Sequence, residues 1–336
     1  MNPEEYSRER RQRRERIRKR KRRARIRGLL LLLIIAVAIV FGARKAASMI
    51  QGPFEGGTAI QWYAYKNMNM LDAVPEVKED PANALNEVFR KNFDVQLTEG
   101  KNYANVAESY AYDTREIREY ILGTKEYKGD KKLVFLTFDD GPNQTITPQI
   151  LDVLNEEDVH ATFFLVGSSI SNRNRDVMLR QIREGNALAL HSMSHDYSKM
   201  YPGRSGNAER IKWEAEQSQE ALQEVISKDF HSSVWRYPGG HQSWQNLAAS
   251  DNALHALDVE WIDWNVLTGD AEPRSRRPSN SEELISFFEK SISRADNQDV
   301  LVVLMHDAQN KQLTLDTLPD VIHWLKDEGY TFGILR

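Results

Sequence analysis

From Lys132 to the end of the sequence, short apolar runs alternate with amphipathic segments that have a helical period. The runs are rich in β-branched and aromatic residues, which is typical of strands that are covered on both faces. Between them, segments such as 147–157, 210–226 and 318–329 repeat their apolar residues at the spacing of a helix. The predicted strands are 133–138, 160–166, 187–191, 233–237, 259–266, 300–306 and 330–335.

This alternation predicts an α/β fold, either a barrel or an open parallel sheet. We place the domain at 131–336. The region before it, 51–130, combines aromatic residues with many polar ones, and only 83–92 has a helical pattern. We therefore expect 51–130 to be an extracellular stalk or a small accessory region without chemistry of its own.

A third pattern lies near the N-terminus. Residues 28–43 carry no charge, and at ~1.5 Å per residue a helix of this length spans about 24 Å, slightly less than a ~30 Å hydrocarbon core. The uncharged residues up to Ile50 and the flanking basic side chains can close the difference. The pattern predicts a single transmembrane helix at 28–50. A cleaved signal peptide is the alternative.

The charge distribution orients this anchor. The net charge is −4, but residues 1–27 hold 14 Lys and Arg against 4 Asp and Glu, and the rest of the chain holds 31 against 45. The positive-inside rule then predicts a cytoplasmic tail at 1–27 and an extracellular catalytic domain. An acidic body argues against nucleic acid as a partner. The sequence has no cysteine, which excludes disulfides, thiolate ligands and a cysteine nucleophile.

Polar residues gather where the predicted strands end. In α/β barrels, the C-terminal rim of the strands carries the catalytic groups. Surface loops would instead scatter such residues over both rims. The residues at or just past strand ends are Asp139, Asp140, His191, His195, Arg236, Asp270 and His306.

His191 and His195 form an H-x-x-x-H pair, which can converge on one face of a helix or in a strand-to-loop turn. Zinc commonly takes two histidines and one carboxylate and keeps a fourth position for water. Either Asp139 or Asp140 can supply the carboxylate. We interpret the remaining histidines as structural or surface residues: His160, His231, His241, His255 and His323.

A metal used for hydrolysis needs a base for the water proton and an acid for the leaving group. The aspartate that does not bind the metal is the candidate base, and Arg236 would keep it ionised. His306 is the candidate acid, because a carboxylate such as Asp270 would raise its pKa. Each residue alone could belong to an ordinary ion pair, but the whole set favours an enzyme.

Five segments, TFDDGP, HSMSH, RYPGG, WNVLTGD and VLVVLMHD, resemble in order and spacing the motifs of the polysaccharide deacetylase family, the NodB-homology domain of carbohydrate esterase family 4. The resemblance covers roughly residues 132–336 and is greatest to membrane-anchored peptidoglycan N-acetylglucosamine deacetylases. It implies a distorted (β/α)7 barrel with one divalent metal, usually Zn²⁺, with Co²⁺ or another divalent ion as alternatives.

The resemblance also implies individual roles. Asp139 is similar to the general base of the family, and Arg236 to the arginine that orients it. Asp140, His191 and His195 are similar to the metal ligands. The implied reaction removes an N-acetyl group from N-acetylglucosamine in a polymer, with a backbone N–H of the turn after Arg236 assisting the oxyanion.

Asp270 and His306 resemble the pair that supplies the general acid.

Two departures from the family pattern concern the walls of the pocket. Many members read R-x-P-Y-G where this chain has RYPGG, and many have Asp-Trp where it has Asp270-Ala271. By resemblance, the substrate pocket is lined by Trp264, Leu304, Tyr237, Pro238 and Gly239.

An extracellular domain held by one helix suits a cell-wall substrate, so we expect peptidoglycan. Deacetylation of poly-N-acetylglucosamine, chitin or acetyl-xylan is the alternative. A non-catalytic wall-binding protein is a further alternative, but there we would expect a base, acid or metal ligand to be replaced, and none is.

Overall fold

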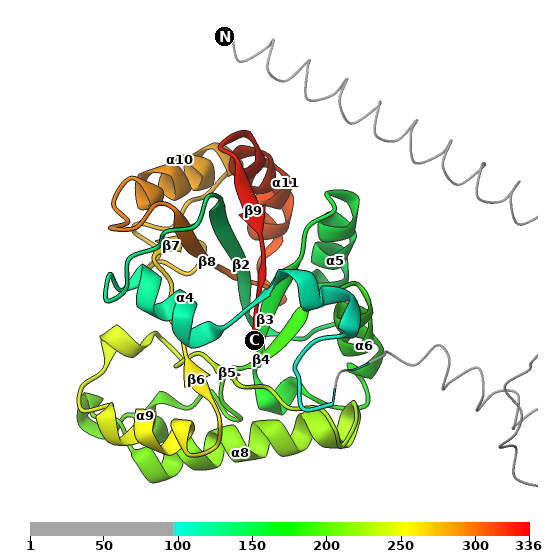
Figure 1. Ribbon diagram of the computed structural model, residues 1–336, viewed down its shortest axis with the longest axis vertical. Helices are drawn as coiled ribbons and strands as arrows, with labels where there is room; N and C mark the ends of the chain where they lie inside the picture. Colours follow the sequence, from blue (N-terminus) through cyan, green and yellow to red (C-terminus); the bar gives the residue numbers. More distant parts are fainter. Residues whose placement is uncertain (1–96, 98) are drawn as a thin grey trace, which may run out of the picture. The chain divides into compact units, whose positions relative to one another are not determined.

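The computed structural model describes Leu97 and residues 99–336 (Figure 1). The tail predicted at 1–27, the anchor predicted at 28–50 and most of the region 51–130 lie outside the described residues. Within the described part of the chain, no helix combines the length and the apolar character needed to cross a membrane.

The described chain is built on a curled sheet whose strands all run parallel. The strand order is β6-β5-β4-β3-β2-β8-β7, and β9 pairs with β2 beside this path. Since β6 and β7 are the two ends of this order, the sheet forms a half-barrel, and the predicted α/β class is confirmed. The strands are β2 (Lys132–Gly141), β3 (Ala161–Leu165), β4 (Ala187–Leu190), β5 (Val234–Trp235), β6 (Glu260–Trp261), β7 (Val266–Leu267), β8 (Val300–His306) and β9 (Tyr330–Phe332).

Two predicted strands are wrong in extent. The run 259–266 splits into β6 and β7, which pair with β5 and β8 at opposite ends of the sheet. The run 330–335 splits at Gly333 into β9 and β10 (Ile334–Leu335). A side chain at Gly333 would meet the rings of Tyr112 and Phe135, so the chain bends there against packed aromatics. Apolar composition marks a buried segment but does not show which neighbour it pairs with.

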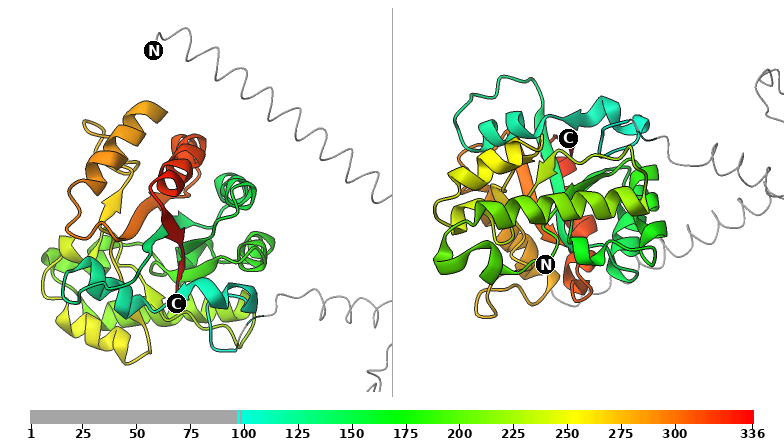
Figure 2. Two further views of the ribbon diagram at one scale, coloured as in Figure 1. Left: turned by 45° about the horizontal axis from the view of Figure 1, so that its top comes forward. Right: turned by 90° about the horizontal axis from the view of Figure 1, so that it is seen from below.

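Most of the described helices surround the strands on their outer side (Figures 1 and 2). The longest of the described helices, α8, crosses the molecule in the right-hand view of Figure 2. The helices are α4 (Thr114–Ile121), α5 (Ile146–Glu156), α6 (Arg175–Arg183), α7 (Tyr197–Met200), α8 (Ala208–Val225), α9 (Ala248–His255), α10 (Ser281–Ile292) and α11 (Gln312–Asp327). Short 3₁₀ helices span Asn105–Tyr110, Gly167–Ser169, Pro202–Arg204 and His241–Ser243.

The period of two along each strand separates two cores. On β2, Val134 and Phe138 pack in the cluster that includes the outer helices, whereas Leu133 and Phe135 pack in a second cluster on the inner face. Because successive side chains point to opposite faces, Asp139 continues the inner series. The inner face therefore becomes polar where the strands end.

A short helix and a two-stranded ribbon cover this inner core. Ile117 and Ile121 of α4 belong to the inner cluster together with Leu335 of β10. β10 pairs in parallel with β1 (Ala111–Tyr112). Ile117, Ile121 and β1 belong to the region 51–130, which we expected to be a stalk or accessory region. Its described part thus contributes side chains to the core on the inner face of the sheet.

Candidate metal and catalytic centre

The polar residues predicted at strand ends lie together on the inner face. Asp139 on β2 is the register partner of His306 on β8. His191 directly follows β4, and Arg236 directly follows β5. Alternation explains this placement, because Ala189 and Val234, two positions earlier, both belong to the inner apolar cluster.

Asp140, His191 and His195 form a cluster that could hold a metal ion. Their ligand atoms lie within 4.8 Å of one another. Asp140 Oδ1 is 3.8 Å from His191 Nε2 and 3.5 Å from His195 Nε2. The two histidines converge through the loop after β4 and not on a helix, which settles the alternative left by their spacing. Two imidazoles and a carboxylate are a donor set that suits Zn²⁺.

The surroundings of His191 prepare its Nε2 as a ligand. Nδ1 lies 2.9 Å from the carbonyl oxygen of Arg236. A carbonyl can only accept, so Nδ1 carries the proton and Nε2 keeps a free lone pair. Burial, only partly offset by Asp140, lowers the pKa of His191 to about 3, which keeps the ring neutral.

A buried carboxylate on α8 holds the loop that carries both histidines. Glu214, which is fully buried, accepts hydrogen bonds from the backbone N–H groups of Met193 at 2.8 Å and Ser194 at 2.7 Å. It also accepts from the Ser194 hydroxyl at 2.6 Å and pairs with Arg210. Sequence reasoning missed Glu214. The available signal was a lone acid on the apolar face of a helix, between Ile211 and Ala215.

Asp139 has a different partner from Asp140. Its Oδ1 accepts from Nη1 of Arg236 at 2.8 Å, and its Oδ2 lies 3.7 Å from His191 Nε2. Arg236 is fully buried, and the same nitrogen also donates to Thr137. The guanidinium lies over the ring of Phe164, with 3.9 Å from Cζ to the ring centroid.

His306 and Asp270 form the expected pair. Nδ1 of His306 is 2.9 Å from Asp270 Oδ1, and the His306 backbone N–H donates to Oδ2 at 2.9 Å. Burial opposes the charge on His306, but the charge of Asp270 and its hydrogen bond outweigh burial, so the pKa of His306 rises above 6.5. Burial likewise opposes ionisation of Asp270, yet His306 holds the pKa of Asp270 below 3.8. Thr314 and Lys311 donate to Asp270 and complete this arrangement.

The residues expected to line the substrate pocket differ in how far they are exposed to solvent. Gly239 is exposed and Trp264 is half-buried, whereas Leu304 and Pro238 are buried. The Tyr237 side chain lies on the other side of the strand from Arg236. Because Arg236 points inward, Tyr237 points outward into the core, where its hydroxyl donates to Asp251.

The turn after Arg236 offers one backbone donor. Pro238 has no N–H, and the Gly240 N–H donates to the Tyr237 carbonyl at 2.8 Å. Among the described residues, the Gly239 N–H has no partner. Gly239 and Gly240 have φ of 81° and 84°, a conformation that glycine adopts without strain.

Asp307, next to His306, is a further acid that sequence reasoning missed. It is fully buried, and burial raises its pKa to about 7. Oδ2 accepts from the Thr147 hydroxyl at 2.5 Å, and Oδ1 has no partner in the described part of the chain. A side chain at Gly141 would collide with this carboxyl group, so Asp307 helps to fix the turn after Asp140.

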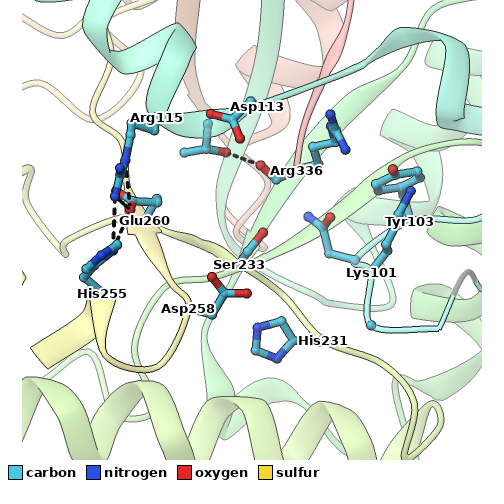
Figure 3. Close-up of a pocket in the computed structure, with 13 residues that line it drawn as sticks. Lys101, Tyr103, Asp113, Arg115, His231, Ser233, His255, Asp258, Glu260 and Arg336 are labelled. Atoms are coloured by element: carbon cyan, nitrogen blue, oxygen red, sulfur yellow. Dashed lines mark hydrogen bonds and ion pairs between the residues drawn. The ribbon is translucent and has the colours of Figure 1, made fainter.

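A polar pocket of about 450 Å³ lies away from this centre (Figure 3). Ser233 and Glu260 mark the N-terminal ends of β5 and β6, so the pocket lies at the opposite end of the strands from the candidate site. Arg115 and His255 both bind Glu260 at its wall. None of the predicted catalytic residues lines it.

The polar site lies at the C-terminal rim of a parallel half-barrel. Its cluster of two histidines and Asp140 lies near a second carboxylate, Asp139, and the imidazole of His306. This arrangement is typical of metal-assisted hydrolases. A sequence model of the polysaccharide deacetylase family matches residues 126–257. This stretch includes Asp139, Asp140, both loop histidines and Arg236 but ends before Asp270 and His306.

Known proteins show the same relationship. YheN of Bacillus subtilis, a putative polysaccharide deacetylase, is 32% identical over 64% of this chain and 71% of its own length. A peptidoglycan-N-acetylglucosamine deacetylase of Bacillus cereus is 26% identical over 62% and 89%. A bifunctional xylanase/deacetylase of Pseudobutyrivibrio xylanivorans is 31% identical over 60% of this chain and 30% of its own length. The match to this chain thus spans less than a third of that relative.

Among solved structures, a Streptococcus mutans CE4 esterase is 45% identical, with a TM-score of 0.68 over 72% of this chain and 99% of the esterase. The chain therefore belongs to the polysaccharide deacetylase family, carbohydrate esterase family 4, and is a hydrolase of the class that acts on the amide bonds of N-acetyl groups.

The role of Glu214 can be tested through the stability of the loop and its affinity for metal. Glu214→Ala leaves two backbone N–H groups without acceptors, each at a cost of about 1–3 kcal/mol. We expect a lower free energy of unfolding and, at temperatures where the variant is folded, about 10- to 100-fold weaker Zn²⁺ binding in chelator competition. Glu214→Gln should lie between the variant and the parent.

Glu216→Ala is the matched control, because Glu216 lies on the same helix but is partly exposed and pairs with Lys212. It should change neither measurement appreciably. Equal Zn²⁺ affinity in Glu214→Ala and the parent would show that the loop keeps its geometry without this carboxylate.

Proposed function

We propose that this protein removes N-acetyl groups from N-acetylglucosamine residues of peptidoglycan and releases acetate. The observation that carries the proposal is the arrangement of one three-residue cluster, Asp140, His191 and His195, beside Asp139 and in reach of His306 through the register of β2 and β8. The activity named for the Bacillus cereus relative supports the choice of peptidoglycan.

The cluster fits a divalent metal, best Zn²⁺, since its three ligand atoms converge and His191 presents an unprotonated Nε2. When bound there, the metal would supply a Lewis acid for the acetyl carbonyl and for the attacking water. The residues of the chain then carry the proton transfers and the positioning of the substrate.

Asp139 is the proposed general base. Arg236 donates to Oδ1 and fixes its position, which leaves Oδ2 on the side of the proposed metal ligands. Oδ2 takes one proton from the water as the C–O bond to the acetyl carbon forms. The Gly239 N–H, the donor left over in the turn, is placed to stabilise negative charge on the carbonyl oxygen.

His306 is the proposed general acid. Its raised pKa favours the cationic form, and Asp270 fixes Nδ1 so that Nε2 carries the transferable proton. The proton moves to the glucosamine nitrogen as the C–N bond breaks. Acetic acid and a free amine leave, and the acid ionises to acetate in water. The proton taken by Asp139 balances the proton given by His306.

The base and the substrate can be tested together. We expect the Zn²⁺-loaded protein to release acetate from peptidoglycan faster than from chitooligosaccharides, poly-N-acetylglucosamine or acetyl-xylan. Asp139→Asn should lower acetate release by about 10²- to 10⁴-fold because the water loses its base, while Zn²⁺ binding persists. Enzymatic acetate assays and chelator competition measure the two effects.

Asp130→Asn, an exposed acid just before β2, is the control and should behave as the parent. Retained turnover in Asp139→Asn would reverse the assignment within the aspartate pair. No release from any glycan by a metal-loaded protein would exclude the proposed activity. Preference for acetyl-xylan would favour that glycan as the substrate in place of peptidoglycan.

The pH dependence should report the His306–Asp270 pair. A general acid works when protonated, so the rate should fall as pH rises through the raised pKa of His306. Asp270→Asn removes the charge that supports the imidazolium, so the alkaline limb of kcat/KM should move by about one pH unit or more to lower pH. Asp316→Asn, an exposed acid on α11, should leave the profile unchanged. An unshifted limb in Asp270→Asn would assign the acid elsewhere.

We also propose that residues 28–50 anchor the protein in the cell membrane, with the tail 1–27 in the cytoplasm and the catalytic domain outside. The uncharged run and the basic tail support this. Replacing Ile35 and Ile39 by Arg should move the full-length protein from the membrane to the soluble fraction, since each charge at mid-membrane costs about 2.5–3.5 kcal/mol. Ile17→Arg, in the tail, is the control. Membrane retention of the double variant, or a mature chain that begins after this segment, would contradict the anchor.

A further inference from the structure

A half-exposed tyrosine stands at the edge of the candidate metal cluster without a part in the proposed chemistry. Tyr197 is the first residue of α7 and follows His195 by two positions. Its side chain is 43% exposed, and its ring centroid lies 5.2 Å from that of His195. An apolar ring with this exposure beside a reaction centre is available to contact a substrate.

Tyr197 also borders the turn that carries the free backbone donor. A β-carbon at Gly239 would lie 3.4 Å from the Tyr197 hydroxyl oxygen and 3.3 Å from Cζ2 of Trp244. On the other side of the turn, a β-carbon at Gly240 would lie 2.9 Å from Cη2 of Trp264. Because both positions are glycine, aromatic rings can pack directly against the turn at Gly239 and at Gly240. These rings supply an apolar wall beside the site, which the two glycines cannot supply.

The Tyr197 ring is firmly supported from behind. Trp244 meets it edge-on, with centroids 5.4 Å apart, and stacks on Tyr201 at 4.0 Å. Trp244 Nε1 donates to the carbonyl oxygen of Pro238 at 2.9 Å, which ties the aromatic group to the turn. Because its neighbours are fixed, the exposed ring can bind a ligand with little loss of side-chain freedom.

We propose that Tyr197, backed by Trp244, forms one wall of a pyranose-binding subsite, which takes the sugar unit next to the one that is deacetylated. In the proposed reaction the acetamide lies between the candidate metal cluster, Asp139 and His306, and a ring beyond His195 is placed to meet the part of the substrate that extends past the cluster. The apolar C–H face of a pyranose packs on the Tyr197 ring, and sugar hydroxyl groups remain toward water. This inference rests on the proposed deacetylase function and adds a determinant of chain length to it.

Kinetics on substrates of increasing length test the subsite. With the Zn²⁺-loaded full chain, Tyr197→Ala should raise KM for N-acetylglucosamine tetramers about tenfold, which corresponds to ~1.4 kcal/mol. It should affect the monosaccharide and a small aryl acetate much less, because neither has a second sugar ring. Tyr197→Phe keeps the ring and should restore most of the affinity for tetramers.

Trp213→Ala is the matched control, since Trp213 is 41% exposed and lies on α8 beneath the Arg210 guanidinium. It should not change the preference for tetramers. An equal loss of activity on tetramer, monosaccharide and aryl acetate in Tyr197→Ala would show a general effect on the centre and would overturn the subsite.

Measurements of oligosaccharide binding test the subsite independently of the proposed deacetylase activity. In the Asp139→Asn background, calorimetry with the tetramer should give a Kd about tenfold weaker when Tyr197→Ala is added. If the parent releases no acetate but this difference in Kd is found, the deacetylase proposal fails and the subsite stands. Equal Kd values with and without the Tyr197 ring would overturn the subsite whatever the activity.

Discussion

The buried ion pair between Arg236 and Asp139 is the constraint on which the centre depends. Arg236 is completely shielded from water, and removing an unpaired charge from water costs several kcal/mol. The charge is tolerated because the guanidinium donates to Asp139, to Thr137 and to the carbonyl oxygens of Ile262 and Asp263. These contacts join β2, β5 and the segment after β6. If one strand end shifted, a buried charge would lose its partner. The pair therefore fixes the relative positions of the strand ends that carry the other groups of the site.

The same pair explains how two adjacent acids can serve different purposes. Asp139 follows the strand alternation inward to Arg236, whereas Asp140 leaves the strand with φ of 78°, at an irregularity in the β2–β3 register. Its carboxylate turns toward His191 and His195 instead. Each acid therefore has its own cationic or ligand environment, which offsets the repulsion expected between neighbouring carboxylates.

The sequence predicted the parts of the site that follow from alternation. Asp139 and Arg236 lie at inner positions because they continue series of buried apolar residues two positions apart, and Asp270 meets His306 as expected. Glu214 and Tyr197 could not be predicted in this way. Their positions depend on how α8 and α7 pack beside a loop that is distant in sequence or irregular in backbone, and neither factor has a periodic signature. Family resemblance, not periodicity, distinguished Asp139 from Asp140.

The strained backbone at the candidate metal cluster shows why groups outside it matter. Asp140, Ser192 and His195 all have positive φ, at 78°, 65° and 53°. A residue held in such a conformation costs of order 1–3 kcal/mol, and three within one site would relax unless their surroundings prevented it. Glu214 holds the loop between the histidines, and Asp307 packs against the turn after Asp140. The ligands thus converge because two buried carboxyl groups outside the cluster keep the backbone in a shape that it would not adopt alone.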